Sequence, residues 1–315
     1  MGLVLYYLWA EVPYRGYDGP SIIVEVPHQS VQDILELLQE RGVLRKGPFG
    51  RVYLALTRRT TKLQAGEYLF EEPITAPQVF KKLVKGDILY HRVTVPEGVR
   101  SGQIFNAFIK EGFGSEVEFQ QEFLKVSRIA DLDPEAADLE GYLFPDTYAL
   151  AKGTPAARIV DQMVENHRHL WGEDWLREAR EQGFNVRQAV TLASLIEKET
   201  GQGSERPLIS SVFHNRVREG MKLQCDPTII YALVMRDRYR GVITRSDLRL
   251  DSRYNTYAYP GLPPGPIANP GREAIQAALF PERTEYLFFV SMNNGRHTFS
   301  TTLREHNQAV DRYQR

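Results

Sequence analysis

The chain has 315 residues, of which 42% are hydrophobic and 25% are charged, and its formal net charge is −1. This length and balance are typical of a globular protein with two or more hydrophobic cores. Near-zero net charge argues against a nucleic-acid-binding protein, which normally carries a basic face or stripe. Cys225 is the single cysteine, so an internal disulfide is excluded, and we expect it to be a small packed residue.

The N-terminal segment begins with an apolar run, Leu3–Ala10, that contains tyrosines and a tryptophan. The run is too short to cross a bilayer, which takes about 20 residues. It also lacks the basic start and the small-residue cleavage site of a signal peptide. Tyrosine and tryptophan are typical of a membrane interface. We therefore expect residues 1–20 to be the remnant of a membrane anchor or a juxtamembrane segment, with a short buried strand as the alternative.

The first half of the chain carries one plan twice. A β-type run at Ser21–Val26 leads into a helical pattern that stops at Gly42. A second run at Arg92–Val95 leads into another helical pattern, which stops at Gly112. Two copies are too few for a solenoid, which needs three or more repeats. The pattern predicts two small βα modules.

The later part of each copy repeats as well. Gly66–Phe70 (GEYLF) matches Glu140–Phe144 (EGYLF), and each stretch precedes a helical pattern, at Ala76–Val84 and Pro155–His167. The predicted fold class is α+β, with these parts in chain order: the segment 1–20, a module at 21–90, a second related module or connector at 91–170, and a larger helix-rich region at 171–315.

Val186–Gly220 contains two helical patterns joined by a short loop. At about 100° per residue, the first helix has an apolar face with Glu197 on its flank and Glu199 at its edge, nearer solvent. An apolar face disfavours the charged carboxylate and raises its pKa toward that of a usable proton donor. The alternative is an internal ion pair of Glu197 with Arg206 or Arg216.

Several polar residues follow in the second helix and beyond. Glu205 lies in the first turn of that helix, and Asn215 and Arg216 lie late in it, where they could reach back toward Glu197. Asp226, before a proline, is the expected N-cap of a further helix. We expect His297, at the rim of a predicted hairpin, to be structural.

The loop that follows contains Asn255 and Tyr257 and is stiffened by prolines, which fix its backbone at low entropic cost. Signatures of other chemistries are missing from the sequence. It has no GxSxG elbow, no P-loop, no HExxH and no cysteine-pair pattern, and its histidines are scattered. We therefore expect no metal site and no cofactor.

Five stretches of the second half stand out together: Leu192–Thr200 (LASLIEKET), Ser204–Arg206 (SER), His214–Arg216 (HNR), Gly220–Leu233 (GMKLQCDPTIIYAL) and Tyr254–Gly271 (YNTYAYPGLPPGPIANPG). In this order they resemble the YceG/MltG family of endolytic murein transglycosylases. The stretch LEGYLFPDTY near residue 145 is a further match. One such motif would be weak, but five in order are specific.

The resemblance implies that Glu197, the first Glu of the EKET motif, is catalytic. It implies a lyase that cleaves the MurNAc–GlcNAc β-1,4 bond of nascent peptidoglycan strands and so ends their elongation. Ordinary glycosidases use two carboxylates. Here the MurNAc C6 hydroxyl would attack and leave a 1,6-anhydroMurNAc end, so one carboxyl group would serve as acid and then as base. The substrate-binding candidates are Glu199, Glu205, Arg206, Asn215, Arg216, Gln224, Asp226, Asn255 and Tyr257.

Two alternatives stay open. A hydrolysing muramidase, with Glu197 as acid and Asp226 or Glu199 assisting a water, would produce reducing ends. A non-catalytic peptidoglycan-binding scaffold of the envelope would bind strands and release no product.

The resemblance also implies a LysM-like shape for residues 21–90, a fold that cradles N-acetylglucosamine chains elsewhere. Tyr53, Tyr68 and Phe70 are available for a sugar groove, but aromatic residues at strand spacing are more often core residues. A single-pass anchor in the bacterial inner membrane, a catalytic part outside the cytoplasm and peptidoglycan synthases as partners are further implications.

Overall fold

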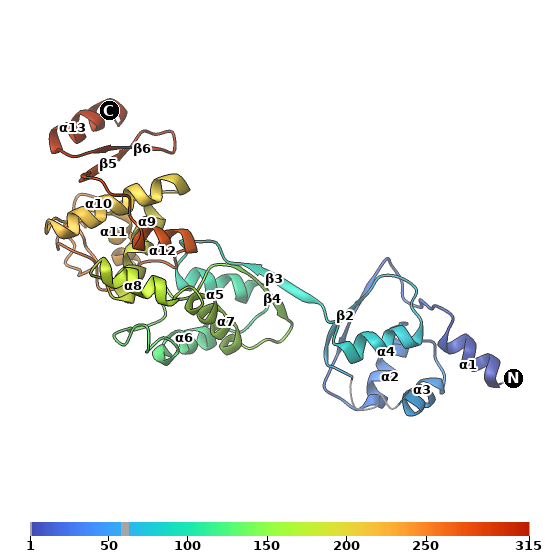
Figure 1. Ribbon diagram of the computed structural model, residues 1–315. Helices are drawn as coiled ribbons and strands as arrows, with labels where there is room; N and C mark the ends of the chain where they lie inside the picture. Colours follow the sequence, from blue (N-terminus) through green and yellow to red (C-terminus); the bar gives the residue numbers. More distant parts are fainter. Residues whose placement is uncertain (1, 58–62, 315) are drawn as a thin grey trace. The chain divides into compact units, whose positions relative to one another are not determined.

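The computed structural model describes residues 2–57 and 63–314 and has a mixed α+β fold (Figure 1). The predicted fold class is therefore confirmed. Its strands form two-stranded sheets, β1–β2, β3–β4 and β5–β6, and the first and last of these pairs are antiparallel.

The helices and strands are, in chain order, α1 (Gly2–Ala10), β1 (Ile22–Val26), α2 (Val31–Glu40), α3 (Phe49–Thr57), β2 (Gly66–Phe70), α4 (Ala76–Lys85), β3 (Tyr90–Thr94), α5 (Ser101–Lys110), α6 (Glu116–Phe123), β4 (Thr147–Ala151), α7 (Ala156–Arg168), α8 (Glu173–Glu181), α9 (Val186–Glu199), α10 (Arg206–Arg218), α11 (Asp226–Val234), α12 (Arg272–Leu279), β5 (Phe288–Ser291), β6 (His297–Ser300) and α13 (Leu303–Tyr313). Short 3-10 helices lie at Val126–Arg128, Gly203–Glu205 and Asp247–Arg249.

The chain divides into two compact units. Unit 1 comprises the residues up to Val93 together with Tyr148–Thr154, and unit 2 comprises Thr94–Thr147 and the residues from Pro155 onward. Unit 1 is therefore discontinuous in sequence. The finer division at residues 20, 90 and 170 stays a prediction.

Ion pairs connect the segment Tyr148–Thr154 to the rest of unit 1. Lys152 reaches two carboxylates of unit 1, at 2.9 Å from Glu25 and 3.1 Å from Glu67. His91 lies 2.6 Å from the other oxygen of Glu67. Burial raises the pKa of Glu67, but the hydrogen bonds to His91 and Lys152 outweigh it and bring that pKa below its usual value.

Unit 1 has its own core beneath the β1–β2 pair. α2 starts at Ser30, whose hydroxyl accepts from the backbone N–H of Asp33, and it buries Leu38 completely. Tyr53, Tyr68 and Phe70 lie in the same core cluster with at most 8% of their surface exposed. The expectation that these aromatic residues are core residues is confirmed, and they have little ring surface left for a sugar.

The apolar run at the start of the chain is the helix α1, so the alternative of a short strand is wrong. Trp9 is buried, and its Nε1 donates to the carbonyl of Arg45 at 2.9 Å. Val4, Tyr7 and Leu8 are exposed. Among residues 2–57 and 63–314, no helix combines the length and the apolar character that a bilayer crossing requires.

The duplicated plan appears as an order of elements. Unit 1 has β1-α2-α3-β2-α4, and the next part of the chain has β3-α5-α6-β4-α7. Glu140–Phe144, which matches Gly66–Phe70 in sequence, is a turn, and the strand of the second copy begins later, at Thr147. The backbone N–H groups of Gly141 and Leu143 donate to the side chain of Asn269 and so cannot join a strand ladder.

Asn269 connects this turn to the proline-rich loop that precedes α12. Its Oδ1 accepts from Gly141 and Leu143, both at 2.9 Å, and its Nδ2 donates to the Val99 carbonyl and to Glu140. All four hydrogen-bonding positions of this buried amide are thus used. The stretch around residue 145 is accordingly a structural brace.

α9 is the central helix of unit 2. It begins at a capping box in which Asn185 and Gln188 bond each other's backbone N–H groups, at 2.8 and 2.9 Å. Every residue from Ala189 to Ile196 is buried, and α12, α10, α11 and α8 pack around the helix. The chain turns to an extended conformation at Thr200, so the EKET motif occupies the exposed end of an otherwise buried helix.

Candidate active site

Unit 2 contains a pocket of about 460 Å³ at the C-terminal end of α9. Its walls come from α9, the start of α11, the β5–β6 hairpin and α13, which are far apart in sequence. The lining residues are Glu199, Arg216, Leu223, Gln224, Asp226, Tyr257, Phe289, Val290, Ser291, His297, His306, Val310 and Gln314.

Glu199 is the carboxyl group at the base of this pocket. Burial raises its pKa, and the charge of Asp226 acts in the same direction. A hydrogen bond with the Cys225 thiol and the charges of His297 and Arg216 oppose that rise but do not cancel it. The environment therefore favours a protonated Glu199. Cys225 is fully packed, as expected, and burial raises the pKa of its thiol.

Asp226 and Tyr257 form a pair on the opposite wall. The Tyr257 hydroxyl donates to Asp226 Oδ1 at 2.6 Å, and burial together with this bond raises the pKa of Tyr257. Asp226 is the first residue of α11, and Cys225 is the N-cap. The prediction that Asp226 caps this helix is therefore wrong by one position, and its carboxylate is turned toward Tyr257.

Arg216 and Asn215 do not reach toward Glu197. The Arg216 guanidinium donates to the carbonyls of Leu287 and Leu223, at 2.6 and 2.7 Å. The Asn215 amide donates to the carbonyls of Thr284 and Tyr286, at 2.9 and 2.8 Å. Both side chains bind the backbone of the segment that leads into the hairpin. The prediction that they reach back toward Glu197 is therefore wrong.

Glu197 lies on the other side of α9. Its Oε1 accepts from Arg206 at 3.1 Å, its Oε2 accepts from the backbone N–H of Gly271 at 2.9 Å, and only 6% of its side chain is exposed. The internal ion pair considered as an alternative is thus present. Arg206 also meets Glu273 and, at 3.5 Å, Glu97.

This cluster holds three carboxylates around one guanidinium. Burial raises the pKa of Glu97, and the charge of Glu197 adds to that rise. Gly271 touches the cluster so closely that a Cβ there would lie 1.8 Å from an oxygen of Glu97. Neither Glu97 nor Glu273 was predicted, because each comes from a segment that no motif singled out.

Glu205 and Asn255 each support another part of the site. Glu205 accepts from both the backbone N–H and the Nδ1 of His297, at 3.0 and 2.8 Å. Asn255 is fully buried and its amide donates to the carbonyls of Leu248 and Leu250, which fixes the loop that carries Tyr257.

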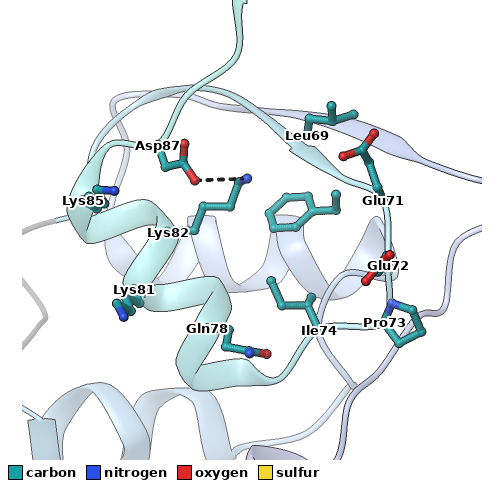
Figure 2. A pocket seen from close by; sticks show the side chains of 11 residues that line it. Leu69, Glu71, Glu72, Pro73, Ile74, Gln78, Lys81, Lys82, Lys85 and Asp87 are labelled. Carbon is teal, nitrogen blue, oxygen red and sulfur yellow. Dashed lines mark ion pairs between the residues drawn. The ribbon is translucent and has the colours of Figure 1, made fainter.

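A separate hollow of about 500 Å³ lies in unit 1, between β2 and α4 (Figure 2). Three lysines, Lys81, Lys82 and Lys85, line it opposite acidic residues. Lys82 is paired with Asp87 at 3.4 Å. Opposite charges are balanced across this hollow, with three lysines and three carboxylates among its lining residues.

A sequence profile of the YceG-like family matches residues 24–312 of the chain. The chain belongs to the YceG-like family.

Named relatives and a solved structure agree with this membership. The chain is 31% identical to the Bacillus subtilis protein named endolytic murein transglycosylase, over 96% of this chain and 87% of that protein. It is 26% identical to a protein of the same name from Streptococcus pneumoniae D39, over 97% of this chain but 60% of that longer protein. A crystal structure of a YceG-like protein from Listeria monocytogenes superposes with a TM-score of 0.62 at 32% identity, covering 92% of this chain and 98% of that one.

In this YceG-like chain, the predicted candidates divide between two places. The residues that line the α9 pocket are Glu199, Arg216, Gln224, Asp226 and Tyr257. The residues that lie outside it are Glu197, Glu205, Arg206, Asn215 and Asn255, each held by the contacts given above. The pocket residues that no pattern revealed belong mainly to the hairpin and α13, where the sequence shows only ordinary strand and helix periodicity.

Proposed function

We propose that this chain is a lytic transglycosylase, a lyase that cuts peptidoglycan glycan strands at internal MurNAc–GlcNAc bonds. Family membership and the shared name of relatives from Bacillus subtilis and Streptococcus pneumoniae support the proposal. The observation that carries it is the carboxyl group of Glu199, which lines a pocket and whose pKa is raised by burial. Cleavage of a glycosidic bond needs such a proton donor for the leaving oxygen.

The contacts favour Glu199 over Glu197 as the acid. Both oxygens of Glu197 are bonded, one to a guanidinium and the other to a backbone N–H. A substrate oxygen would have to displace one of these partners. Glu199 instead lines an open pocket, so we propose that it donates the proton and that Glu197 orders the surrounding loops.

We further propose that the C6 hydroxyl of MurNAc is the attacking group, which leaves a 1,6-anhydroMurNAc end. In this scheme one acid suffices, and the proton that the hydroxyl gives up returns Glu199 to its acid form. Gln224, Tyr257 and Arg216 are proposed to position the sugars, because they line the same pocket.

A hydrolysing muramidase is the second candidate. The observation in its favour is that Asp226 shares the pocket with Glu199, and ordinary glycosidases use two carboxyl groups. Asp226 accepts the Tyr257 hydroxyl on Oδ1, and its other carboxylate oxygen would activate the water.

Mass spectrometry of products from uncrosslinked glycan strands tests both candidates, with wild type beside Glu199→Gln and Glu197→Gln. Internal cuts with 1,6-anhydroMurNAc ends, lost in Glu199→Gln and kept in Glu197→Gln, would support the proposed reaction and residue. Reducing ends would favour the muramidase. Loss only in Glu197→Gln would return the acid role to Glu197, and intact strands with folded wild type would favour a non-catalytic scaffold.

Unit 1 is proposed to be LysM-like and to bind glycan. The order β1-α2-α3-β2 with an antiparallel strand pair supports this proposal. The buried aromatic residues of its core would not form the sugar contacts, so binding would use exposed polar groups. Sedimentation with purified peptidoglycan, with and without substitutions of exposed residues in unit 1, tests the role.

We also propose an envelope setting, with an N-terminal anchor in the cytoplasmic membrane, the catalytic unit outside the cytoplasm and peptidoglycan synthases as partners. Activity on glycan strands and the aromatic residues of α1 support this setting. Membrane fractionation and crosslinking of the natural protein in cells test the anchor and the partners.

A further inference from the structure

His297 and Glu205 form a buried dyad beside the Glu199 pocket. Their side chains are 12% and 11% exposed, and Nδ1 of His297 lies 2.8 Å from Glu205 Oε2. The other carboxylate oxygen accepts the backbone N–H of His297 at 3.0 Å, so both oxygens of Glu205 serve one residue. Phe289 packs its ring edge-on to the imidazole at 5.5 Å and limits rotation of the ring.

This arrangement fixes the tautomer of the imidazole. A carboxylate only accepts hydrogen bonds, so in the neutral ring Nδ1 carries the proton and the lone pair is on Nε2. Within residues 2–57 and 63–314, no side chain or backbone group bonds Nε2. The ring lines the same pocket as Glu199, and the charge of His297 acts on the pKa of that carboxyl group.

We propose that His297 is the second catalytic group of this pocket, which takes the proton of the attacking hydroxyl on Nε2, with Glu205 as its positioning residue. The inference rests on the proposed glycosidic cleavage, and it holds whether the hydroxyl belongs to MurNAc C6 or to a water. A carboxylate that accepts Nδ1–H holds the ring in place and stabilises the imidazolium that forms.

The step balances as follows for either hydroxyl. The attacking oxygen forms a bond to C1 of the MurNAc as the bond from C1 to the leaving oxygen breaks. Glu199 gives its proton to the leaving oxygen, and the hydroxyl proton moves to Nε2 of His297. The resulting imidazolium lies between two carboxylates, and the return of its proton to Glu199 restores both groups.

Charged and titratable groups surround the imidazole ring of His297. Glu205 touches it, and the others line the same pocket from α9, α10, α11, the 257 loop and α13: Glu199, Arg216, Asp226, Tyr257 and His306. This set contains three carboxyl groups and one guanidinium.

His297→Asn is the decisive variant, because an asparagine amide can still donate to Glu205 from near the Nδ1 position but has nothing at Nε2. We expect the melting temperature to stay near wild type, KM to change less than about threefold, and kcat to fall by about 10²-fold or more, the usual contribution of a general base. His169→Asn, at the exposed C-cap position that follows α7, is the matched control with wild-type kinetics.

Two results would overturn the inference. One is a His297→Asn enzyme with kcat within about threefold of wild type, which would leave the dyad as a clamp of the hairpin. The other is an imidazole ¹⁵N spectrum of the wild type with the proton on Nε2, a measurement that does not depend on activity. If wild type itself released no product, the proposed function would fail and the base role with it.

Glu205→Gln tests the positioning role. The two His297 donors bond different oxygens of Glu205, and glutamine has an NH2 group in place of one of them, so only one of the two positions can still accept. We expect its amide to face Nδ1 and move the ring proton to Nε2, with a fall in kcat similar to that of His297→Asn. Because the two residues act as a unit, the double variant should be no slower than His297→Asn alone. Additive losses would overturn the positioning role.

Discussion

Glu197 and Glu199 are two positions apart on α9, which turns their side chains by about 200° relative to each other. One therefore faces Arg206 and Gly271, and the other faces the pocket that Asp226 also lines. The sequence pattern could place both at the end of an apolar helix. It could not tell which had a fixed cation, because that depends on where the first turn of α10 lies.

The acid role of Glu199 has a pH signature. An acid works from its protonated form, so we expect kcat/KM to fall as the pH rises through the pKa of Glu199, which burial raises above the usual 4.5. Strand cleavage measured across the acidic and neutral range gives the profile. A profile without a falling limb on its alkaline side would contradict the assignment, and Glu197→Gln, if it is active, should keep that limb unchanged.

Glu140 has a pH effect on stability instead of activity. It is buried beside Ser101 and Asn269, and desolvation raises its pKa from 4.5 to about 7 although hydrogen bonds from Ser101 oppose the rise. The folded state therefore holds this proton more tightly than the unfolded chain does. Its contribution to stability is fully present below about pH 4.5 and is lost as the pH rises to about 7, by on the order of 3 kcal/mol.

Glu140→Gln should remove that pH dependence. Glutamine resembles the protonated acid, and its oxygen can still accept from Ser101 and Asn269. Urea unfolding at one pH below the window and one above it should show the wild type losing stability and the variant losing much less. Equal losses in the two proteins would show that Glu140 is not the group responsible.

At the scale of elements, the sequence predicted where α9 begins and ends but not which elements pack around it. The capping pair of Asn185 and Gln188, the apolar face and the charged end are all local signals. The pocket beside it is lined from α9, α10, the start of α11, the loop that carries Tyr257, the β5–β6 hairpin and α13, and no local signal predicts which of them meet. Residues 140–144 match a strand of unit 1 in sequence but form a turn, since Asn269, far along the chain, bonds their backbone N–H groups.

Loss of the α9 cap tests how much the capping box contributes to the free energy of unfolding. Asn185→Ala removes the oxygen that accepts from the backbone N–H of Gln188 and should reduce the free energy of unfolding by about 1 kcal/mol. Asn185→Asp keeps that acceptor and should stay close to wild type. Urea midpoints of the purified variants give the comparison, and kcat should not change, because the pocket lies at the other end of the helix. A destabilised Asp variant would mean that the cap oxygen is not what matters.

At the scale of the whole molecule, each unit has a core of its own, and the pocket belongs to unit 2 alone. Composition indicated more than one core, and the repeated plan indicated small βα modules. Neither could show that β4 belongs with the first unit, because hydrophobic periodicity does not reveal that the chain returns to an earlier unit.

A core substitution in unit 1 should therefore reduce the stability of that unit without reducing the rate of catalysis in unit 2. Leu38→Ala removes a fully buried side chain and should destabilise unit 1 by about 2–5 kcal/mol. With soluble short strands as substrate and at a temperature where unit 2 is folded, kcat should remain at the wild-type value. Leu192→Ala, equally buried in α9, is the matched control and should lower both unit 2 stability and activity. A large fall in kcat for Leu38→Ala would contradict the independence of the two cores.

The return of Tyr148–Thr154 to unit 1 has a consequence for how the chain is made and inherited. A ribosome that has released the first 93 residues has not yet supplied β4 or Lys152, although Glu25 and Glu67 are already in place. Unit 1 can finish folding only after the first segment of unit 2 has emerged. A gene fragment ending at Val93 would encode β3 without its partner strand, so recombination cannot transfer this unit between genes as one uninterrupted block.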